Sequence, residues 1–293
     1  MTQATVSTGL RSDREITSSQ KTMIFILAMA IFGLSELILE IVPDVNIGPA
    51  QLGISYFAFI PATLAALFAP AQVALGAVTG KIIFSGLLMG DFGGIGELES
   101  FIQMSVAIYV GGMMVSNPKN RKQIFWSAVV IVFIDKFVGG VVDTLKVVVG
   151  VEEFEAVQGL PASIYATEAY ALVTDVLISG VIFGGIPAMV LVPRLHGKIE
   201  PMLGMKPRTA RPASNWSFIT PKRVVITLVL FVISGVVAFA EELGYTFLVW
   251  EPDFLDQYGN GWLFGGIAVA AIALVVILLA IRKRSGGKQY DLD

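Results

Sequence analysis

Residues 22–42 read TMIFILAMAIFGLSELILEIV, an apolar stretch in which Glu36 and Glu40 are the only charged side chains. The hydrocarbon core of a bilayer is about 30 Å thick, and a helix needs about 20 predominantly apolar residues to cross it. A barrel strand would show about ten residues of alternating hydrophobicity instead. The stretch therefore predicts a transmembrane helix near the start of the chain.

Seven further apolar blocks follow, at residues 53–69, 71–90, 101–116, 124–150, 164–193, 224–250 and 262–281. The sequence is 55% hydrophobic and only 15% charged, whereas a soluble domain carries about 25% charged residues. Only Pro70 separates the second block from the third, which predicts a tight helical hairpin. The expected fold class is an all-α integral membrane protein with about eight transmembrane helices.

The charged residues between the blocks are sorted into two sets. Every Lys and Arg except Lys81, Lys136 and Lys146 lies before the first block, between the fourth and fifth, between the sixth and seventh, or after the eighth. The alternate connections are acidic and contain no basic residue. Since cytoplasmic loops carry an excess of Lys and Arg, we expect a multi-pass protein of the cell membrane with both termini in the cytoplasm.

The same pattern divides the chain into five parts. Residues 1–21 are polar and lack the apolar region of a signal peptide, so they read as a cytoplasmic tail. Residues 22–194 form a six-helix membrane core, and residues 195–222 form a cytoplasmic linker rich in proline and basic residues. Residues 223–284 form a two-helix extension, and residues 285–293 form a second tail.

Several classes of chemistry lack the residues that they require. The chain contains no Cys and a single His, His196, so thiolate metal sites, multi-histidine zinc sites and Ser–His catalysis are excluded. No Walker-type loop is present, so ATP hydrolysis is not expected. Glu241-Glu242 resembles the glutamate pair of membrane CAAX-type proteases, but the Arg expected later is missing. We therefore expect that the protein is not an enzyme and that it binds no cofactor, metal or nucleic acid.

Charged residues inside the apolar blocks indicate where a ligand could bind, because ionisable groups in a membrane normally face a cavity, a partner or the interface. Lys136 and Asp143 lie about 20° apart on one stripe of a helix, and Glu168 and Asp175 share a face of the next. The alternative is a structural role in buried ion pairs. Tyr165 could stack on a ligand ring or belong to an interfacial aromatic belt. The candidate ligand-binding residues are Glu36, Glu40, Asn46, Lys81, Glu97, Gln103, Asp135, Lys136, Asp143, Tyr165, Glu168 and Asp175.

Residues 65–80, AALFAPAQVALGAVTG, form an alanine- and glycine-rich turn around Pro70 that leads into a helix built on small residues. Together with Tyr109-Val110-Gly111-Gly112 at the end of the fourth block, this stretch resembles the substrate-binding (S) components of energy-coupling factor (ECF) transporters. The resemblance covers residues 22–193. It implies a six-helix fold whose outward face binds a vitamin or other micronutrient, in a pocket among the fourth to sixth helices.

The resemblance also implies partners, namely an ECF transmembrane scaffold and two ATPase subunits that energise uptake. The seventh and eighth helices are additional to the six helices of that family. A proton- or ion-coupled secondary transporter is the alternative, supported by the acidic residues within the membrane. A structural or signalling membrane protein is a further possibility.

Overall fold

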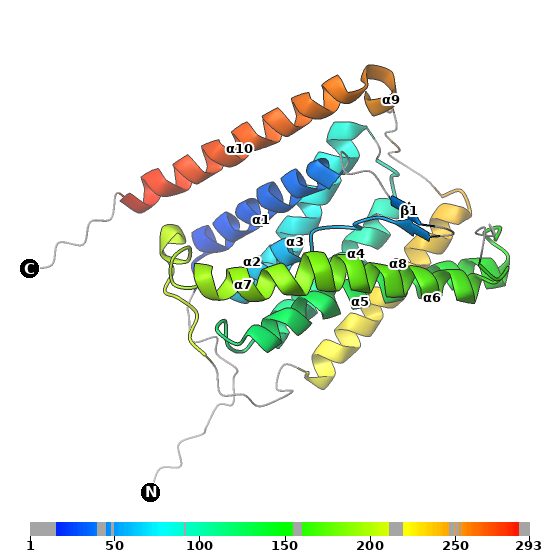
Figure 1. Cartoon of the computed structure of the whole chain (residues 1–293), viewed down its shortest axis with the longest axis horizontal. Helices are drawn as coiled ribbons and strands as arrows, with labels where there is room; N and C mark the ends of the chain where they lie inside the picture. The colour runs from blue at the N-terminus through cyan, green and yellow to red at the C-terminus, as the bar shows by residue number, and fades with distance from the viewer. Residues whose placement is uncertain are drawn as a thin grey trace, which may run out of the picture.

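The structure is a computed structural model, and it describes residues 16–39, 45–47, 50–90, 92–154, 160–210, 219–245, 249, 252 and 254–286. In these residues the chain is almost entirely helical (Figure 1), which confirms the expected all-α fold class. The described exception is a small antiparallel pair, β1 (Val45–Ile47) and β2 (Ala50–Leu52), with Asn46 opposite Gln51.

Each of the eight apolar blocks contains a helix. Four helical stretches are long and apolar enough to cross a membrane, at Ser18–Leu39, Arg121–Val149, Ile164–Leu195 and Pro221–Glu242. The helices are α1 (Ser18–Leu39), α2 (Phe59–Leu67), α3 (Pro70–Lys81), η1 (Ile82–Leu87), α4 (Gly96–Met114), α5 (Arg121–Val149), α6 (Ile164–Asp175), η2 (Val176–Gly185), α7 (Ile186–Leu195), η3 (Pro201–Leu203), α8 (Pro221–Glu242), α9 (Phe254–Tyr258) and α10 (Asn260–Gly286).

Glycines bring α1 and α3 into close contact at the centre of the fold. A Cβ atom at Gly76 would overlap the carbonyl oxygen of Phe25, and one at Gly80 would overlap that of Met29. Small residues at this spacing let two helix backbones approach closely. The Gly76-x-x-x-Gly80 pattern therefore packs two helices together.

Residues 53–69 do not form one long helix. The α2 helix has nine residues and is therefore about 14 Å long, which is less than half of a bilayer core. The backbone before it is non-helical, and the Ser55 N–H donates to the Ser179 hydroxyl at 2.9 Å. A backbone N–H outside a helix needs such a partner when it is shielded from water, and the buried Ser179 supplies one.

The long α5 helix has signals at both ends. The Asn120 side chain accepts hydrogen bonds from the N–H groups of Lys122 and Gln123, which is the usual role of an N-cap. Gly150 ends the helix with a φ of 78°, a left-handed conformation that glycine adopts without steric cost. The intervening residues form a 29-residue helix that contacts α4, α6, η2, α7 and α8.

The two helices of the predicted extension pack on different parts of the core. The α8 helix contacts α4 and the C-terminal part of α5, whereas α10 lies alongside α1 at the opposite side of the molecule (Figure 1). The tryptophan at the start of α10 anchors it, since the Trp262 indole N–H donates to the Leu88 carbonyl oxygen at 3.0 Å. In the described residues, α8 and α10 thus extend the six-helix core on two sides.

Candidate functional site

Polar side chains from segments far apart in the chain meet where α5 passes α6. The Lys136 ammonium lies 3.8 Å from Oδ2 of Asp175, the last residue of α6. The Ser55 hydroxyl donates to Oδ1 of the same carboxylate at 2.5 Å. Asp175 is therefore held both by a charged partner and by the non-helical segment before α2.

The neighbouring residues extend this group. The ring of Tyr56 is buried, and its hydroxyl lies close enough to Asp135, Glu36 and Asp175 to interact with them electrostatically. Asp135 also lies close enough to Lys136, and to Lys81 at the end of α3, for electrostatic attraction. We call these residues the central cluster: Glu36, Ser55, Tyr56, Lys81, Asp135, Lys136, Asp175 and Ser179.

Two helices change geometry at the central cluster. Lys81 immediately precedes the π-helical segment η1, and Asp175 immediately precedes the π-helical segment η2. Segments with i→i+5 hydrogen bonds are rare and frequently occur at functional sites. Both π-helical segments in the described chain thus begin directly after a charged residue of the same cluster.

A second cluster surrounds Lys146, whose side chain is only 11% exposed. Its ammonium contacts Asp143 at 3.1 Å on the same helix and Glu152 at 3.0 Å in the loop that follows. The third partner is Glu242 of α8, at 3.3 Å. Three carboxylates around one ammonium leave this Lys146 cluster with a net negative charge.

Gly139 and Gly140 of α5 lie between the two clusters and leave room for polar side chains from both neighbouring helices. A Cβ at Gly140 would meet the Glu168 carboxylate of α6 at 2.8 Å, and one at Gly139 would lie 3.5 Å from the Gln103 amide oxygen of α4. Gln103 in turn donates to Glu99 at 2.7 Å. Lys136 and Lys146 are ten residues apart, which is about 15 Å along an α-helix, so polar groups continue along α5 between them.

Glu99 lies in the first turn of α4, outside the four candidate spans. Burial raises the pKa of its carboxyl to about 7, and the hydrogen bond from Gln103 opposes this shift. Nearby Asp143 and Glu241 also raise the pKa, whereas Lys146 lowers it. Glu99 therefore changes its charge near neutral pH.

The structure brings together most of the candidate residues, but not all of them. Glu36, Lys81, Asp135, Lys136 and Asp175 belong to the central cluster. Asp143 belongs to the Lys146 cluster, and Gln103 and Glu168 lie beside α5 between the two clusters. Tyr165 is 64% exposed, which agrees with the interfacial alternative. Glu97 is half-buried in the first turn of α4. Glu40 and the side chain of Asn46 lie outside what the structure describes.

The sequence patterns did not single out the three uncharged residues of the central cluster. Ser55, Tyr56 and Ser179 are uncharged and sit within apolar blocks. A signal was present in the Ser55-Tyr56 pair near the start of a block otherwise poor in polar groups. Glu242 was not among the candidate residues, and its contact with Lys146 joins two residues that are 96 positions apart in sequence.

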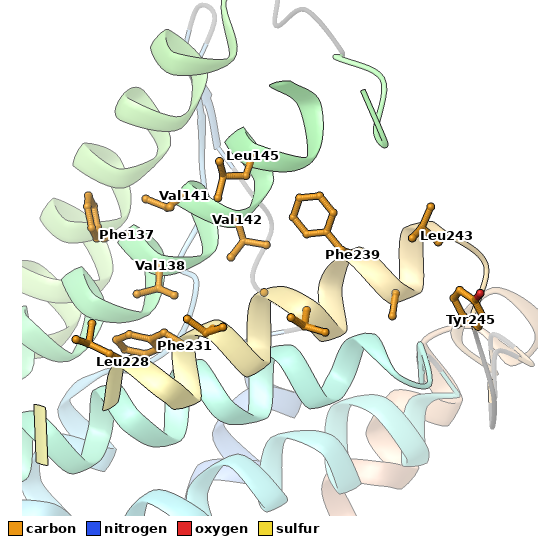
Figure 2. A pocket seen from close by; sticks show the side chains of 14 residues that line it. Phe137, Val138, Val141, Val142, Leu145, Leu228, Phe231, Phe239, Leu243 and Tyr245 are labelled. Carbon is orange, nitrogen blue, oxygen red and sulfur yellow. The ribbon is translucent and has the colours of Figure 1, made fainter. Parts of the chain in front are cut away.

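Two apolar grooves lie among the described helices, outside the central cluster. The larger, of about 680 Å³, runs between α5 and α8 (Figure 2) and is lined by side chains such as Phe137, Val141 and Phe239. The other, of about 280 Å³, lies between α1, α2, α7 and η3. Neither is lined by a residue of the central cluster, whose Lys136 and Asp175 side chains are 34% and 23% exposed.

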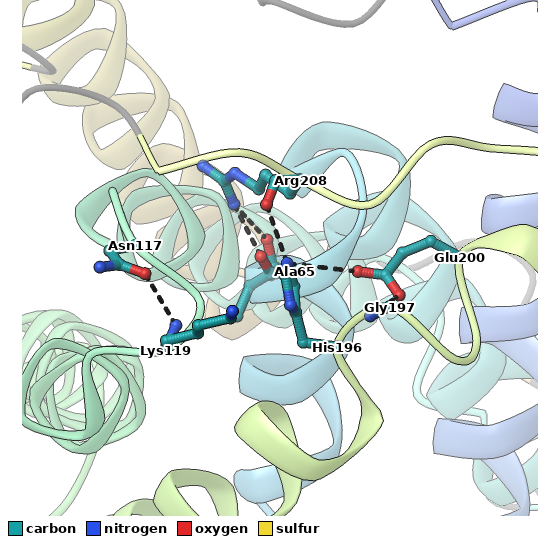
Figure 3. A network of polar contacts seen from close by, with 8 residues as sticks. Ala65, Asn117, Lys119, His196, Gly197, Glu200 and Arg208 are labelled. Atoms are coloured by element: carbon teal, nitrogen blue, oxygen red, sulfur yellow. Dashed lines mark hydrogen bonds and ion pairs between the residues drawn. The ribbon is translucent and has the colours of Figure 1, made fainter.

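The segment after α7 is a packed strap rather than a loose linker, as far as residue 210. Glu200 is fully buried and accepts from the Gly197 N–H at 2.7 Å, while His196 Nε2 lies 2.8 Å from the Arg208 carbonyl oxygen. The Arg208 guanidinium donates to the carbonyl oxygens of Ala65 and Ala66 at 3.4 and 2.9 Å (Figure 3). The strap therefore holds the C-terminal end of α2.

The described residues contain no group of three or more His, Cys, Asp or Glu side chains arranged to hold a metal ion. No curated protein and no solved structure matches the chain. One family model does match, that of a family of unknown function (DUF8171), over residues 23–290. The match runs through the six-helix core, the strap, α8 and α10. The chain belongs to the DUF8171 family of unknown function.

Proposed function

We propose that this protein is a multi-pass membrane protein, with both termini in the cytoplasm, that binds a small polar solute in the central cluster. It acts as the substrate-binding subunit for uptake of a vitamin or other micronutrient, and partner ATPases energise the uptake. The observation that carries this proposal is the convergence of Ser55, Lys136 and Asp175 between helices apolar enough to cross a membrane.

The cost of placing these groups in a bilayer is the physical argument for a functional role. A charged side chain at the bilayer centre is unfavourable by several kcal/mol, and a buried ion pair commonly contributes little net stability. Stability alone would be served as well by apolar side chains at Lys136 and Asp175. Solute binding requires such groups, because they can exchange their partners for those of the solute.

The polar residues along α5 suggest the route of entry. The Lys146 cluster lies at the C-terminal end of α5, which the charge sorting assigns to the outer side of the membrane. Gly139 and Gly140 leave space for polar side chains between this cluster and the central one. A solute then reaches Asp175 when this carboxylate separates from Ser55 and Lys136.

The dependence on partner ATPases rests on the sequence. The chain has no nucleotide-binding loop of its own, and the resemblance to ECF S components lies at residues 65–80, which form the end of α2, the turn and most of α3. We therefore propose an ECF transmembrane scaffold with its ATPase subunits as the partners.

Native mass spectrometry of the protein purified from its own membranes tests the proposal. The wild-type chain should retain a small molecule, and Asp175→Asn and Ser55→Ala should each lower the retained fraction at least tenfold. Ser116→Ala is the matched control, because its hydroxyl bonds to Gln123 between α4 and α5. Retention that is unchanged in both cluster variants would refute the site. Co-purification of an ATPase pair would support the energised assembly.

A proton-coupled secondary transporter is the second candidate, and one observation favours it. Glu168 is half-buried beside Gly140 and makes no ion pair in the part of the chain that the structure describes. Such a carboxylate suits proton transfer within a membrane. Uptake by liposomes containing this chain alone, driven by a pH gradient and lost in Glu168→Gln, would favour this candidate over the ATP-driven assembly.

A further inference from the structure

The groove between α5 and α8 carries a second inference, which rests on the membrane placement proposed above but not on the solute-binding site. The α5 side presents Phe137, Val141 and Leu145, and the α8 side presents Leu228 and Phe239 (Figure 2). Val232 of α8 also lines the groove. Tyr245 supplies the only side-chain hydroxyl among the lining residues. Both helices are candidate membrane spans, so the groove opens where hydrocarbon would surround the protein.

The groove exists because α5 and α8 meet near one end and leave a gap further along. The two helices meet through Lys146 and Glu242 at 3.3 Å. Further along α8, Gly235 has no side chain to fill the space, and a Cβ there would reach only Val142 at 3.8 Å. A helix with its side chains is 10–12 Å across, which is too wide for a gap between helices in contact. A single hydrocarbon chain is narrow enough.

The charges at the two ends of the groove indicate which lipid would lie there. One end is bounded by the Lys146 cluster, in which three carboxylates outnumber the ammonium and would repel a phosphate. Near the other end, Lys222 and Arg223 begin α8. They precede Leu228, the first groove residue on that helix, by five or six residues, which is about 8 Å along the helix.

We infer that the α5–α8 groove binds an acyl chain of an anionic phospholipid, whose phosphate lies against Lys222 and Arg223. Basic residues beside a membrane attract anionic headgroups. By the charge sorting of the loops, the start of α8 faces the cytoplasm, so the lipid belongs to the cytoplasmic leaflet. The lipid fills the space that Gly235 leaves open and bridges α8 to the core.

The test compares two lipids on the purified full-length protein by native mass spectrometry. Phosphatidylglycerol and phosphatidylcholine with identical acyl chains are titrated separately. We expect phosphatidylglycerol to bind about tenfold more tightly, and the double variant Lys222→Gln/Arg223→Gln to abolish this preference. Lys119→Gln, which removes a basic residue from another connection of the same charge set, is the matched charge control and should preserve the preference.

A second set of variants tests the groove itself. Gly235→Leu and Val232→Phe should each reduce retention of phosphatidylglycerol about tenfold, because the added side-chain atoms occupy the space of the acyl chain. Val229→Leu is the control, since Val229 is exposed on α8 but does not line the groove. Equal binding of both lipids by the wild type overturns the inference. So does unchanged retention in both filled variants, or a dimer that Gly235→Leu dissociates, which would place a second copy there.

Discussion

Lys146 on α5 and Glu242 on α8 lie 3.3 Å apart, and this contact joins the six-helix core to a helix beyond it. The same ammonium contacts Asp143 and Glu152, so one residue connects carboxylates from a helix, a loop and a second helix. The family match includes α8 together with the core. The α8 helix is thus a structural part of the polar region along α5.

Replacement of Lys146 by Met should lower stability by about 1–3 kcal/mol, because three partly buried carboxylates lose their shared counter-charge. The thermal unfolding midpoint in detergent measures this effect. Adding Glu242→Gln should recover part of the loss, since it removes one of the carboxylates left unpaired. Strictly additive effects of the two substitutions would show that this contact contributes nothing.

Removal of the Ser179 hydroxyl should destabilise the break before α2. Ser179→Ala leaves the half-buried Ser55 N–H without its acceptor, and loss of such a hydrogen bond costs about 0.5–1.5 kcal/mol. Ser105→Ala is the matched control, because the Ser105 hydroxyl is buried and makes no hydrogen bond among the described residues. Thermal unfolding of both variants checks this. If they lose the same stability, Ser179 does not support the non-helical segment.

Arg208→Ala should loosen the strap from the core. The guanidinium is 8% exposed and donates to Ala65 and Ala66, and a hydrogen bond from a charged group contributes about 1.5–3 kcal/mol. Limited proteolysis of the 195–210 segment should then become faster. The control is Lys198→Ala, an exposed residue of the same strap. Cleavage at the wild-type rate in Arg208→Ala would mean that this contact does not hold the strap.

Glu99 should make stability depend on pH near neutrality. Its folded pKa of about 7 lies above the ordinary value of 4.5, so between these values the folded state binds more protons than the unfolded state. Stability then falls as pH rises through this range. We expect the unfolding midpoint to decrease from pH 5 to pH 8 in the wild type and to decrease less in Glu99→Gln. Identical pH profiles would exclude Glu99 as the source.

The sequence was sufficient to locate the helices and part of the polar region. Apolar blocks of about 20 residues are visible without any tertiary information, because a bilayer imposes that length. Helical spacing likewise placed Lys136 and Asp143 on one stripe of α5, and Glu168 and Asp175 on one face of α6. Whether α5 and α6 face one another depends on the tertiary fold, and the Lys136–Asp175 contact shows that they do.

Other features depend on interactions that no local pattern encodes. The block at 53–69 has the length of a spanning helix, but Ser55 bonds to Asp175 and Ser179, more than 100 residues later in the chain. These bonds replace helical ones and leave α2 short. The packing of Arg208 on α2 is equally non-local, since a proline-rich basic segment normally reads as a solvated linker.

Cysteine accessibility tests whether water and solutes reach the central cluster from outside, and it needs no background correction because the chain contains no cysteine of its own. Gly139 and Ser55 are each replaced by a single cysteine. Each variant is then treated from the outer side with a membrane-impermeant, negatively charged thiosulfonate. Ala62→Cys in the core and Val275→Cys on the apolar face of α10 serve as controls. A water-filled route to the central cluster predicts modification at Gly139→Cys and Ser55→Cys well above both controls. Reaction rates no higher than those of the controls would contradict the account of a solute-binding site.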